Sequence, residues 1–350
     1  MRSELSILYV GSPNGTSGHR AAALERLGHH VHRVNPYDAL SRHWRLWLAR
    51  TGGAGVDARV ARALSEGVGA RVFDIAFVDS GEVLGPKCLA LLRAAAFTVV
   101  NYNADNPYLD PPPERQRWAL LRSALPLYDL CVSFRRPNQE ANMLAAGVRN
   151  PFVTWLCADE MAHRAPETIL DAFRSKVVFA GTWMPGRGRI MSRLLDLGVP
   201  LTIDGPRWDK APERARLAPV LRHGYLDTTA YAQSVAGADV ALVFLNPANN
   251  DIHTSRTAEI PALGTAMVAP RTSAHQALYQ EGIEALFYDT IEDCAACCLG
   301  LLSDADARKT LARAGHDRVA LNGMYNEPLL SGIVDAALSL STPRRSHVAG

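Results

Sequence analysis

Four charged side chains in the second half of the chain stand where predicted strands give way to helices. Arg187 and Arg189 lie at the start of one predicted helix. Arg256 and Glu259 are three residues apart in another, so they share one side of it. A guanidinium beside a helix N-terminus makes a good phosphate site, because backbone N–H groups and a fixed charge act on the same oxygens. We therefore expect Arg256 and one of Arg187 and Arg189 to hold phosphate groups.

Acidic and histidine side chains in the first half of the chain could act as bases towards a hydroxyl group. Asp79 and Asp105 fall at the ends of predicted strands, where a carboxylate could take a proton from an acceptor. Helix capping or turn formation is the alternative for both, and we favour it for Asp110, which precedes three prolines. His19, at the start of a predicted helix, is a further candidate base, although we favour a surface position for it.

The loop GSPNGTSGH at 11–19 is rich in glycine and follows the first predicted strand. Gly15 could let the backbone approach a ligand in front of a helix N-terminus. The spacing differs from the Gly-x-Gly-x-x-Gly pattern of dinucleotide-binding proteins, which argues against an NAD enzyme. An ordinary strand-to-helix turn is an equally good interpretation of this loop.

Composition excludes several classes of function. The chain has 350 residues, of which 48% are hydrophobic and 21% charged, and a formal net charge of +2. Such a balance is typical of a globular protein. The small net charge gives no indication of binding to nucleic acid or to an anionic membrane. No apolar run is long enough to span a bilayer and no signal peptide precedes the first strand, so we expect a cytoplasmic protein with reduced thiols.

Metal binding is not expected. Cys294, Cys297 and Cys298 have helical spacing among alanines and leucines, which favours helix packing over a metal site. No Asp-x-Asp motif stands in a polar loop after a strand, so a metal-bridged diphosphate is not indicated either.

Short apolar runs alternate with longer helical patterns along the chain, which predicts an α/β protein with parallel sheets. Two series of strands are separated by a polar, proline-containing segment. The first is predicted at 5–11, 29–36, 74–81, 98–105, 129–136 and 151–159, and the second at 176–182, 200–206, 238–247, 265–271 and 285–289. Residues 1–165 and 175–315 should form two Rossmann-like domains, with ligands bound at the carboxyl ends of the strands in a cleft between them. We expect 316–340 to be a helix that crosses back to the first domain, and 341–350 to be a disordered tail.

The run from Glu259 to Val268, Glu-Ile-Pro-Ala-Leu-Gly-Thr-Ala-Met-Val, resembles the Glu-x-x-x-x-Gly-x-Pro-Val-Val signature of group 1 GT-B glycosyltransferases. The run Thr254-Ser255-Arg256 before it, and VVFAGT ending at Gly181 and Thr182, resemble the CgeB-like (spore maturation protein-type) branch. An Asp-x-Pro turn at Asp105 is a third similarity. Many retaining members carry a glutamate eight positions before the signature glutamate, where this chain has Asp251.

The resemblance implies a GT-B fold and a metal-independent, retaining glycosyltransferase. Its donor would be a nucleoside diphosphate sugar, by default a UDP-sugar, and its acceptor a hydroxyl group bound by the first domain. Glu259 would accept hydrogen bonds from the ribose hydroxyls, with Thr254, Ser255 and Gly181 nearby and Asp251 close to the donor sugar. Trp183 could stack on the base or pack between domains. A nucleotide-sugar 2-epimerase and a non-catalytic binding protein of the same fold are the alternatives, and the oligomeric state is open.

Overall fold

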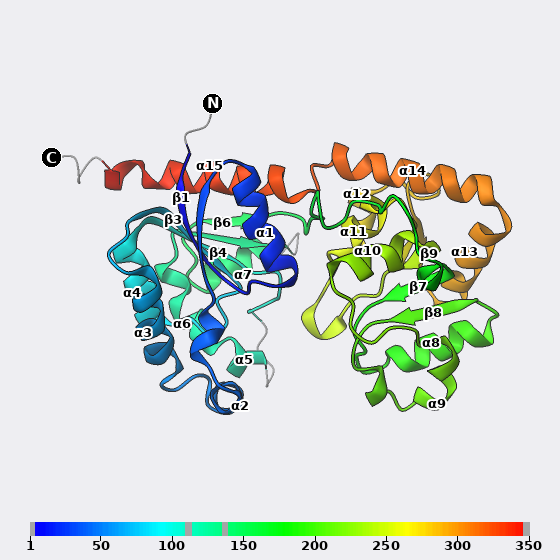
Figure 1. Cartoon of the computed structure of the whole chain (residues 1–350), viewed down its shortest axis with the longest axis horizontal. Helices are drawn as coiled ribbons and strands as arrows, with labels where there is room; N and C mark the ends of the chain where they lie inside the picture. Colours follow the sequence, from blue (N-terminus) through cyan, green and yellow to red (C-terminus); the bar gives the residue numbers. More distant parts are fainter. Residues whose placement is uncertain (1–3, 109–113, 135–138, 346–350) are drawn as a thin grey trace. The chain divides into compact units, whose positions relative to one another are not determined.

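The computed structural model describes residues 4–108, 114–134 and 139–345. The chain forms two compact units, of which the first combines Met1–Trp155 with Asn326–Gly350 and the second comprises Leu156–Tyr325. The C-terminal segment therefore returns to the unit in which the chain begins, as the red helix beside the blue strands shows (Figure 1).

The first unit is built on a parallel sheet of short apolar strands. Its strands are β1 (Ser6–Val10), β2 (His30–Val34), β3 (Phe73–Asp79), β4 (Ala96–Tyr102), β5 (Leu130–Ser133) and β6 (Pro151–Val153), in the order β2-β1-β3-β4-β5-β6. The central strands are buried almost throughout, as expected where both faces of a parallel sheet are covered. The order changes direction between β1 and β3, and this point is the usual ligand site of a doubly wound sheet.

Helices enclose this sheet, and valine and leucine side chains fill the space between. They are α1 (Gly15–Arg26), α2 (Arg42–Thr51), α3 (Val56–Val68), α4 (Pro86–Ala95), α5 (Glu114–Arg117), α6 (Ala119–Ala124), α7 (Gln139–Ala145) and α15 (Asn326–Arg345), with 3-10 turns η1 (Pro36–Ala39) and η2 (Leu125–Leu127). Helix α15 packs against α1 and β4. The Thr98 hydroxyl donates to the Ala337 carbonyl over 3.2 Å, and Arg26 pairs with Glu327 at 2.6 Å.

The second unit repeats the same topology with five parallel strands. They are β7 (Ser175–Ala180), β8 (Leu201–Asp204), β9 (Ala238–Leu242), β10 (Ala266–Pro270) and β11 (Leu286–Tyr288), in the order β11-β10-β9-β7-β8. The change of direction falls between β7 and β9. Gly205 follows β8 with a φ of +131°, and a Cβ there would stand 2.3 Å from the Gly181 carbonyl oxygen, so only glycine fits.

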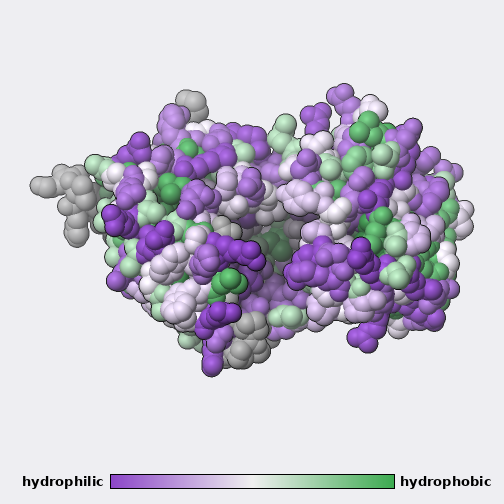
Figure 2. Space-filling view, turned by 60° about the horizontal axis from the view of Figure 1, so that its bottom comes forward, coloured by the Kyte–Doolittle hydropathy of each residue, from purple (hydrophilic) through white to green (hydrophobic). Residues whose placement is uncertain are grey.

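The helices of the second unit are α8 (Arg187–Asp196), α9 (Arg214–Leu217), α10 (Thr228–Ala236), α11 (Arg256–Ala262), α12 (Ser273–Leu278), α13 (Ile291–Ser303) and α14 (Ala305–Leu321), with η3 (Asp171–Phe173), η4 (Trp208–Lys210), η5 (Ala218–Val220) and η6 (Pro247–Asn249). Cys294 and Cys298 are buried in the core and Cys297 packs against it, all as free thiols. Helix packing thus accounts for the cysteine run. Hydrophilic side chains predominate on the face drawn in Figure 2, where hydrophobic ones form small scattered groups.

The α/β architecture with two parallel Rossmann-like sheets is confirmed. The expected strands are present, but several end earlier than expected: β6 stops at Val153 and β9 at Leu242. Residues 156–165, placed in the first domain from the sequence, lie with the second unit, where the Ala158 N–H donates to the Met324 carbonyl over 3.0 Å. Helix α15 runs to Arg345, so 341–345 are helical where a tail was expected; 346–350 lie outside the described residues, as does Asp110.

Candidate functional site

Arg187 and Arg256 meet at the carboxyl ends of β7 and β9, the point where the strand order of the second sheet changes. Arg187 donates to the carbonyl oxygens of Thr182 at 2.7 Å and Phe244 at 3.3 Å. Arg256 donates through Nε to the carbonyl of Ala180, the last residue of β7, at 2.6 Å. These hydrogen bonds fix both guanidinium groups on backbone that follows adjacent strands.

Nearby acids only partly balance the charge of Arg187. Burial and the neighbouring Arg256 lower the pKa of Arg187 to about 10, against the smaller opposing effect of Asp251. A buried cation with a lowered pKa lies in surroundings that disfavour its charge. An anionic ligand would supply the missing charge, so this arrangement suits a phosphate group.

Glu259 lies one turn beyond Arg256 on α11 and is 4% exposed, so it does not belong to an exposed ion pair on the helix surface. Its Oε2 accepts a hydrogen bond from the Tyr231 hydroxyl at 2.7 Å, and its Oε1 is 3.7 Å from Nε2 of His163. Burial alone raises the pKa of Glu259, but His163, Arg256, and hydrogen bonds from Tyr231 and Ser255 outweigh it and hold the pKa below its ordinary value. The carboxylate is therefore ionised and held in a fixed orientation.

His163 and Tyr231 were not among the residues predicted from the sequence. Nδ1 of His163 accepts the N–H of Asp159 at 2.8 Å, which turns Nε2 towards Glu259. The ring of His163 also stands edge-on to that of Tyr231, with centroids 5.9 Å apart. His163 falls in the polar, proline-containing segment between the two series of predicted strands, and Tyr231 lies on helix α10, so neither carried a sequence signal.

Sequence and local hydrogen bonds set the bounds of α11. The Thr254 N–H donates to the Thr257 hydroxyl at 3.2 Å, and Ser255 precedes the first helical residue. Gly264 ends the helix with a φ of +75°, a conformation that favours glycine after a helix. Thr254 and Ser255 thus lie at the N-terminal end of α11, directly before Arg256.

The other residues expected near the phosphate site occupy different surroundings. Arg189 is exposed, whereas Arg187 is buried, so the geometry favours Arg187 of the two. Asp251 closes its own loop, with Oδ1 accepting from Asn249 Nδ2 at 2.8 Å. Trp183 is half-buried and packs against the core of the second unit.

Gly181 has a packing role. A Cβ at this position would stand 2.6 Å from the Phe179 ring, and the Gly181 carbonyl accepts the Trp208 indole N–H at 3.0 Å. The absence of a side chain is therefore explained by the protein interior alone.

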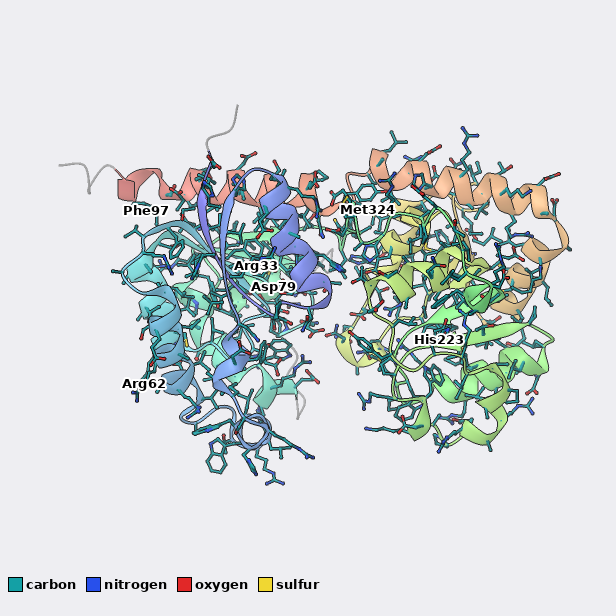
Figure 3. The ribbon with its side chains drawn as sticks, viewed as in Figure 1. Arg33, Arg62, Asp79, Phe97, His223 and Met324 are labelled. Carbon is teal, nitrogen blue, oxygen red and sulfur yellow. The ribbon has the colours of Figure 1, made fainter. Side chains whose placement is uncertain are left out.

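In the first unit, Asp79 lies beside α1 (Figure 3) and is 7% exposed. Its carboxylate accepts from Nε of Arg20 at 2.7 Å and from a second Arg20 nitrogen at 3.1 Å. The Tyr9 hydroxyl, which also contacts Ser17, donates to the same carboxylate. Arg20 and Tyr9 were not singled out from the sequence. Their contacts leave Asp79 badly placed to serve as a base, because its acceptor capacity is taken by buried donors.

The remaining first-unit candidates are more accessible. Asp105 is paired with Arg117 at 3.0 Å, which also contacts Glu82 and Glu114. His19 is half-buried on α1, and Gly15 begins that helix with a φ of +60° and open space where a Cβ would be. Gly11, the first residue of the 11–19 loop, has no such space, since a Cβ would meet Tyr9, Ser17 and Asp79.

The described residues offer neither a metal-binding cluster nor a membrane-spanning helix. Within 4–108, 114–134 and 139–345, no group of three or more His, Cys, Asp or Glu residues could hold a metal ion. In that same part of the chain, no helix is both long and apolar enough to cross a membrane.

Comparison with known proteins places this geometry in context. Residues 187–327, which contain Arg187, Arg256 and Glu259, match the family described as glycosyl transferase-like. A search of curated protein sequences found no significant match.

Solved structures of similar fold cover nearly the whole chain. Sucrose-phosphate synthase from Thermosynechococcus elongatus has a TM-score of 0.69 and 15% identity over 99% of this chain and 100% of that one. HepE from Anabaena in complex with UDP-glucose has a TM-score of 0.64 and 14% identity over 95% and 100%. Trehalose 6-phosphate synthase from Burkholderia multivorans has a TM-score of 0.62 and 12% identity over 98% and 100%. The chain therefore has the fold of GT-B glycosyltransferases, and its residues 187–327 match the glycosyl transferase-like family.

Proposed function

We propose that the protein is a glycosyltransferase that uses a nucleoside diphosphate sugar, by default a UDP-sugar, and needs no metal ion. The observation that carries the proposal is the pair of guanidinium groups of the buried Arg187 and the half-buried Arg256, with Glu259 one helical turn away. Two cations suit the diphosphate, and a buried carboxylate suits the paired hydroxyls of ribose. The similarity to HepE, whose structure contains UDP-glucose, supports the choice of UDP.

In the proposed reaction, the bond between the anomeric carbon and the diphosphate oxygen breaks as the acceptor oxygen bonds to that carbon. The nucleoside diphosphate leaves, and Arg187 and Arg256 stabilise its developing charge in place of a metal ion. Retention of configuration fits the first unit, where Asp79 is held by Arg20 and Asp105 by Arg117. The acceptor proton would then pass to the departing phosphate oxygen. We further propose that the first unit binds the acceptor and that the protein belongs to the CgeB-like branch.

The test is a ligand panel followed by a transfer assay. Nucleoside diphosphates and their sugars are screened for thermal stabilisation, and saturation at about 100 times Kd should stabilise the protein by about 2.7 kcal/mol. The best donor is then incubated with hydroxyl acceptors in EDTA, and glycosylated products are sought by mass spectrometry. Product formed equally with and without EDTA supports the proposal. Loss of activity that manganese or magnesium restores contradicts metal independence.

The same assay separates the two alternatives. A 2-epimerase would release or interconvert the donor sugar with no acceptor present, which NMR of the sugar detects. A binding protein would be stabilised by the nucleotide but would produce neither outcome over long incubation.

A further inference from the structure

A concave site lies at the amino ends of strands of the second sheet, whereas Arg187 and Arg256 lie at the carboxyl ends. Its volume is about 440 Å³, within the usual range for small-molecule pockets. The first residues of β9 and β10, Ala238 and Ala266, line it, together with the C-terminal end of α11 and one side of α14. The amino ends of these strands face this pocket, so it is separate from the proposed donor site.

The walls of the pocket combine an apolar floor with a basic side. Small side chains leave the floor open: Ala238, Ala262, Ala266 and Ala312 contribute methyl groups, and Gly264 has none. Arg308, Lys309, Arg313 and His316 line the side formed by α14. Among the described residues that line the pocket, Asp239 is the single acid.

Asp239 does not neutralise the basic side. Its Oδ1 accepts from Arg308 at 3.2 Å and its Oδ2 from Lys176 at 2.9 Å, so each carboxylate oxygen already has a cation. Arg308 also donates to the Leu301 carbonyl at 2.8 Å. Arg308 is thereby occupied, and Lys309 and Arg313 are the pocket cations left over.

Lys309 and Arg313 stand one helical turn apart, an arrangement of like charges that disfavours the helix slightly. Both are exposed, and within the described part of the chain neither forms an ion pair, including with Asp306 and Asp317 of the same helix. His316 completes this side, with Nδ1 3.0 Å from the Ala262 carbonyl oxygen and able to donate to it. The pocket thus offers two positive charges above an apolar floor.

We propose that this pocket binds a small phosphate monoester whose ring or alkyl body rests on the alanine floor and whose phosphate lies between Lys309 and Arg313. A phosphate monoester carries close to two negative charges at neutral pH, which matches the two available cations. An inorganic anion would leave the alanine side chains of the floor exposed to water. A neutral ring would leave Lys309 and Arg313 without an anionic partner. The proposal does not depend on the proposed transfer reaction.

The test uses phenyl phosphate as the probe, with inorganic phosphate and phenol as its two halves. Calorimetry should show that the full-length protein binds phenyl phosphate about tenfold or more tightly than either half. The double variant Lys309→Glu/Arg313→Glu should weaken that binding by about tenfold or more. Ala165→Trp, a change at an exposed residue that lines the pocket, should weaken it by blocking the pocket.

The matched control is Lys210→Glu/Arg214→Glu, which changes net charge equally at two exposed positions of the second unit that do not line the pocket. The control should bind phenyl phosphate like the parent, and all variants should keep the parent's affinity for UDP. Absence of binding at millimolar phenyl phosphate, equal losses in the two double variants, or an unchanged affinity in Lys309→Glu/Arg313→Glu would each overturn the proposal.

Discussion

The two sheets place an arginine at the same topological position, but they surround it differently. Gly11 follows β1 and Arg20 lies on the next helix; Gly181 follows β7 and Arg187 lies on the next helix. In the first unit, β3 ends in Asp79, which holds Arg20 with two hydrogen bonds. In the second unit, the equivalent strand β9 runs into Val243 and Phe244, with no acid at its end.

The pKa values of the two arginines move in opposite directions. Burial lowers the pKa of Arg20, but Asp79 outweighs burial and the net effect raises it above its ordinary value. Burial and Arg256 lower that of Arg187 to about 10. One acid at a strand end thus decides whether the position is a closed ion pair or a site that lacks an anion. This difference supports the proposal that the second unit, and not the first, binds phosphate.

The first prediction removes one member of the buried ion pair between Arg20 and Asp79. Asp79→Ala leaves the Arg20 guanidinium buried without its partner, and removal of one member of a buried pair costs about 3–5 kcal/mol. Urea denaturation should show a loss of that size in the free energy of unfolding. The double variant Arg20→Met/Asp79→Leu should recover much of it, because no charge is then buried. A loss below about 1 kcal/mol in Asp79→Ala would show that Asp79 is not essential to the first unit.

The second prediction tests Arg187, the second-unit counterpart of Arg20. Arg187→Ala removes a charged donor from the proposed diphosphate site, where such bonds contribute about 1.5–3 kcal/mol each, so the Kd for UDP should rise by at least tenfold and up to about a hundredfold. Arg189→Ala is the matched control, because Arg189 is exposed two residues along the same helix. Calorimetry that gives equal losses for both variants, or none for Arg187→Ala, would contradict the assignment.

The third prediction tests whether Glu259 of the second unit contacts the ribose of a bound nucleotide. Glu259→Ala should raise the Kd for UDP by about tenfold, and Glu259→Gln by less, because the amide keeps one acceptor oxygen. The parent should prefer UDP to its 2′-deoxy form, and the alanine variant should lose that preference. Circular dichroism guards against misfolding at this buried position. Equal binding of both nucleotides by the parent would rule out contact between Glu259 and the ribose.

Sequence periodicity predicted the two parallel sheets because their strands are apolar and bounded by turns. It did not predict the exact ends of β6 and β9, because the apolar pattern continues beyond the last residue of each strand. Arg187 and Arg189 were equivalent in the sequence, since both follow a strand, and only burial separates them. Tyr9 and Arg20 were missed because their partner, Asp79, lies far away in the chain, as His163 does from Glu259. Contacts between distant segments leave no local pattern.

The last prediction concerns Tyr231, an uncharged side chain whose hydroxyl donates a hydrogen bond to Glu259. Tyr231→Phe removes the hydrogen bond to Glu259 and keeps the ring, and the expected loss is about 1 kcal/mol at pH 7. The folded-state pKa of Glu259 lies below its ordinary value of 4.5, so its stabilising contribution is present above pH 4.5 and is lost as pH falls through the folded pKa. The variant should raise that pKa, and the stability difference from the parent should shrink as the pH is lowered from 7 into this acid range. Urea denaturation at several pH values measures it, with Tyr225→Phe as the control because Tyr225 is 78% exposed. A difference that does not change with pH would mean that the Tyr231 hydroxyl acts through packing and not through the Glu259 carboxylate.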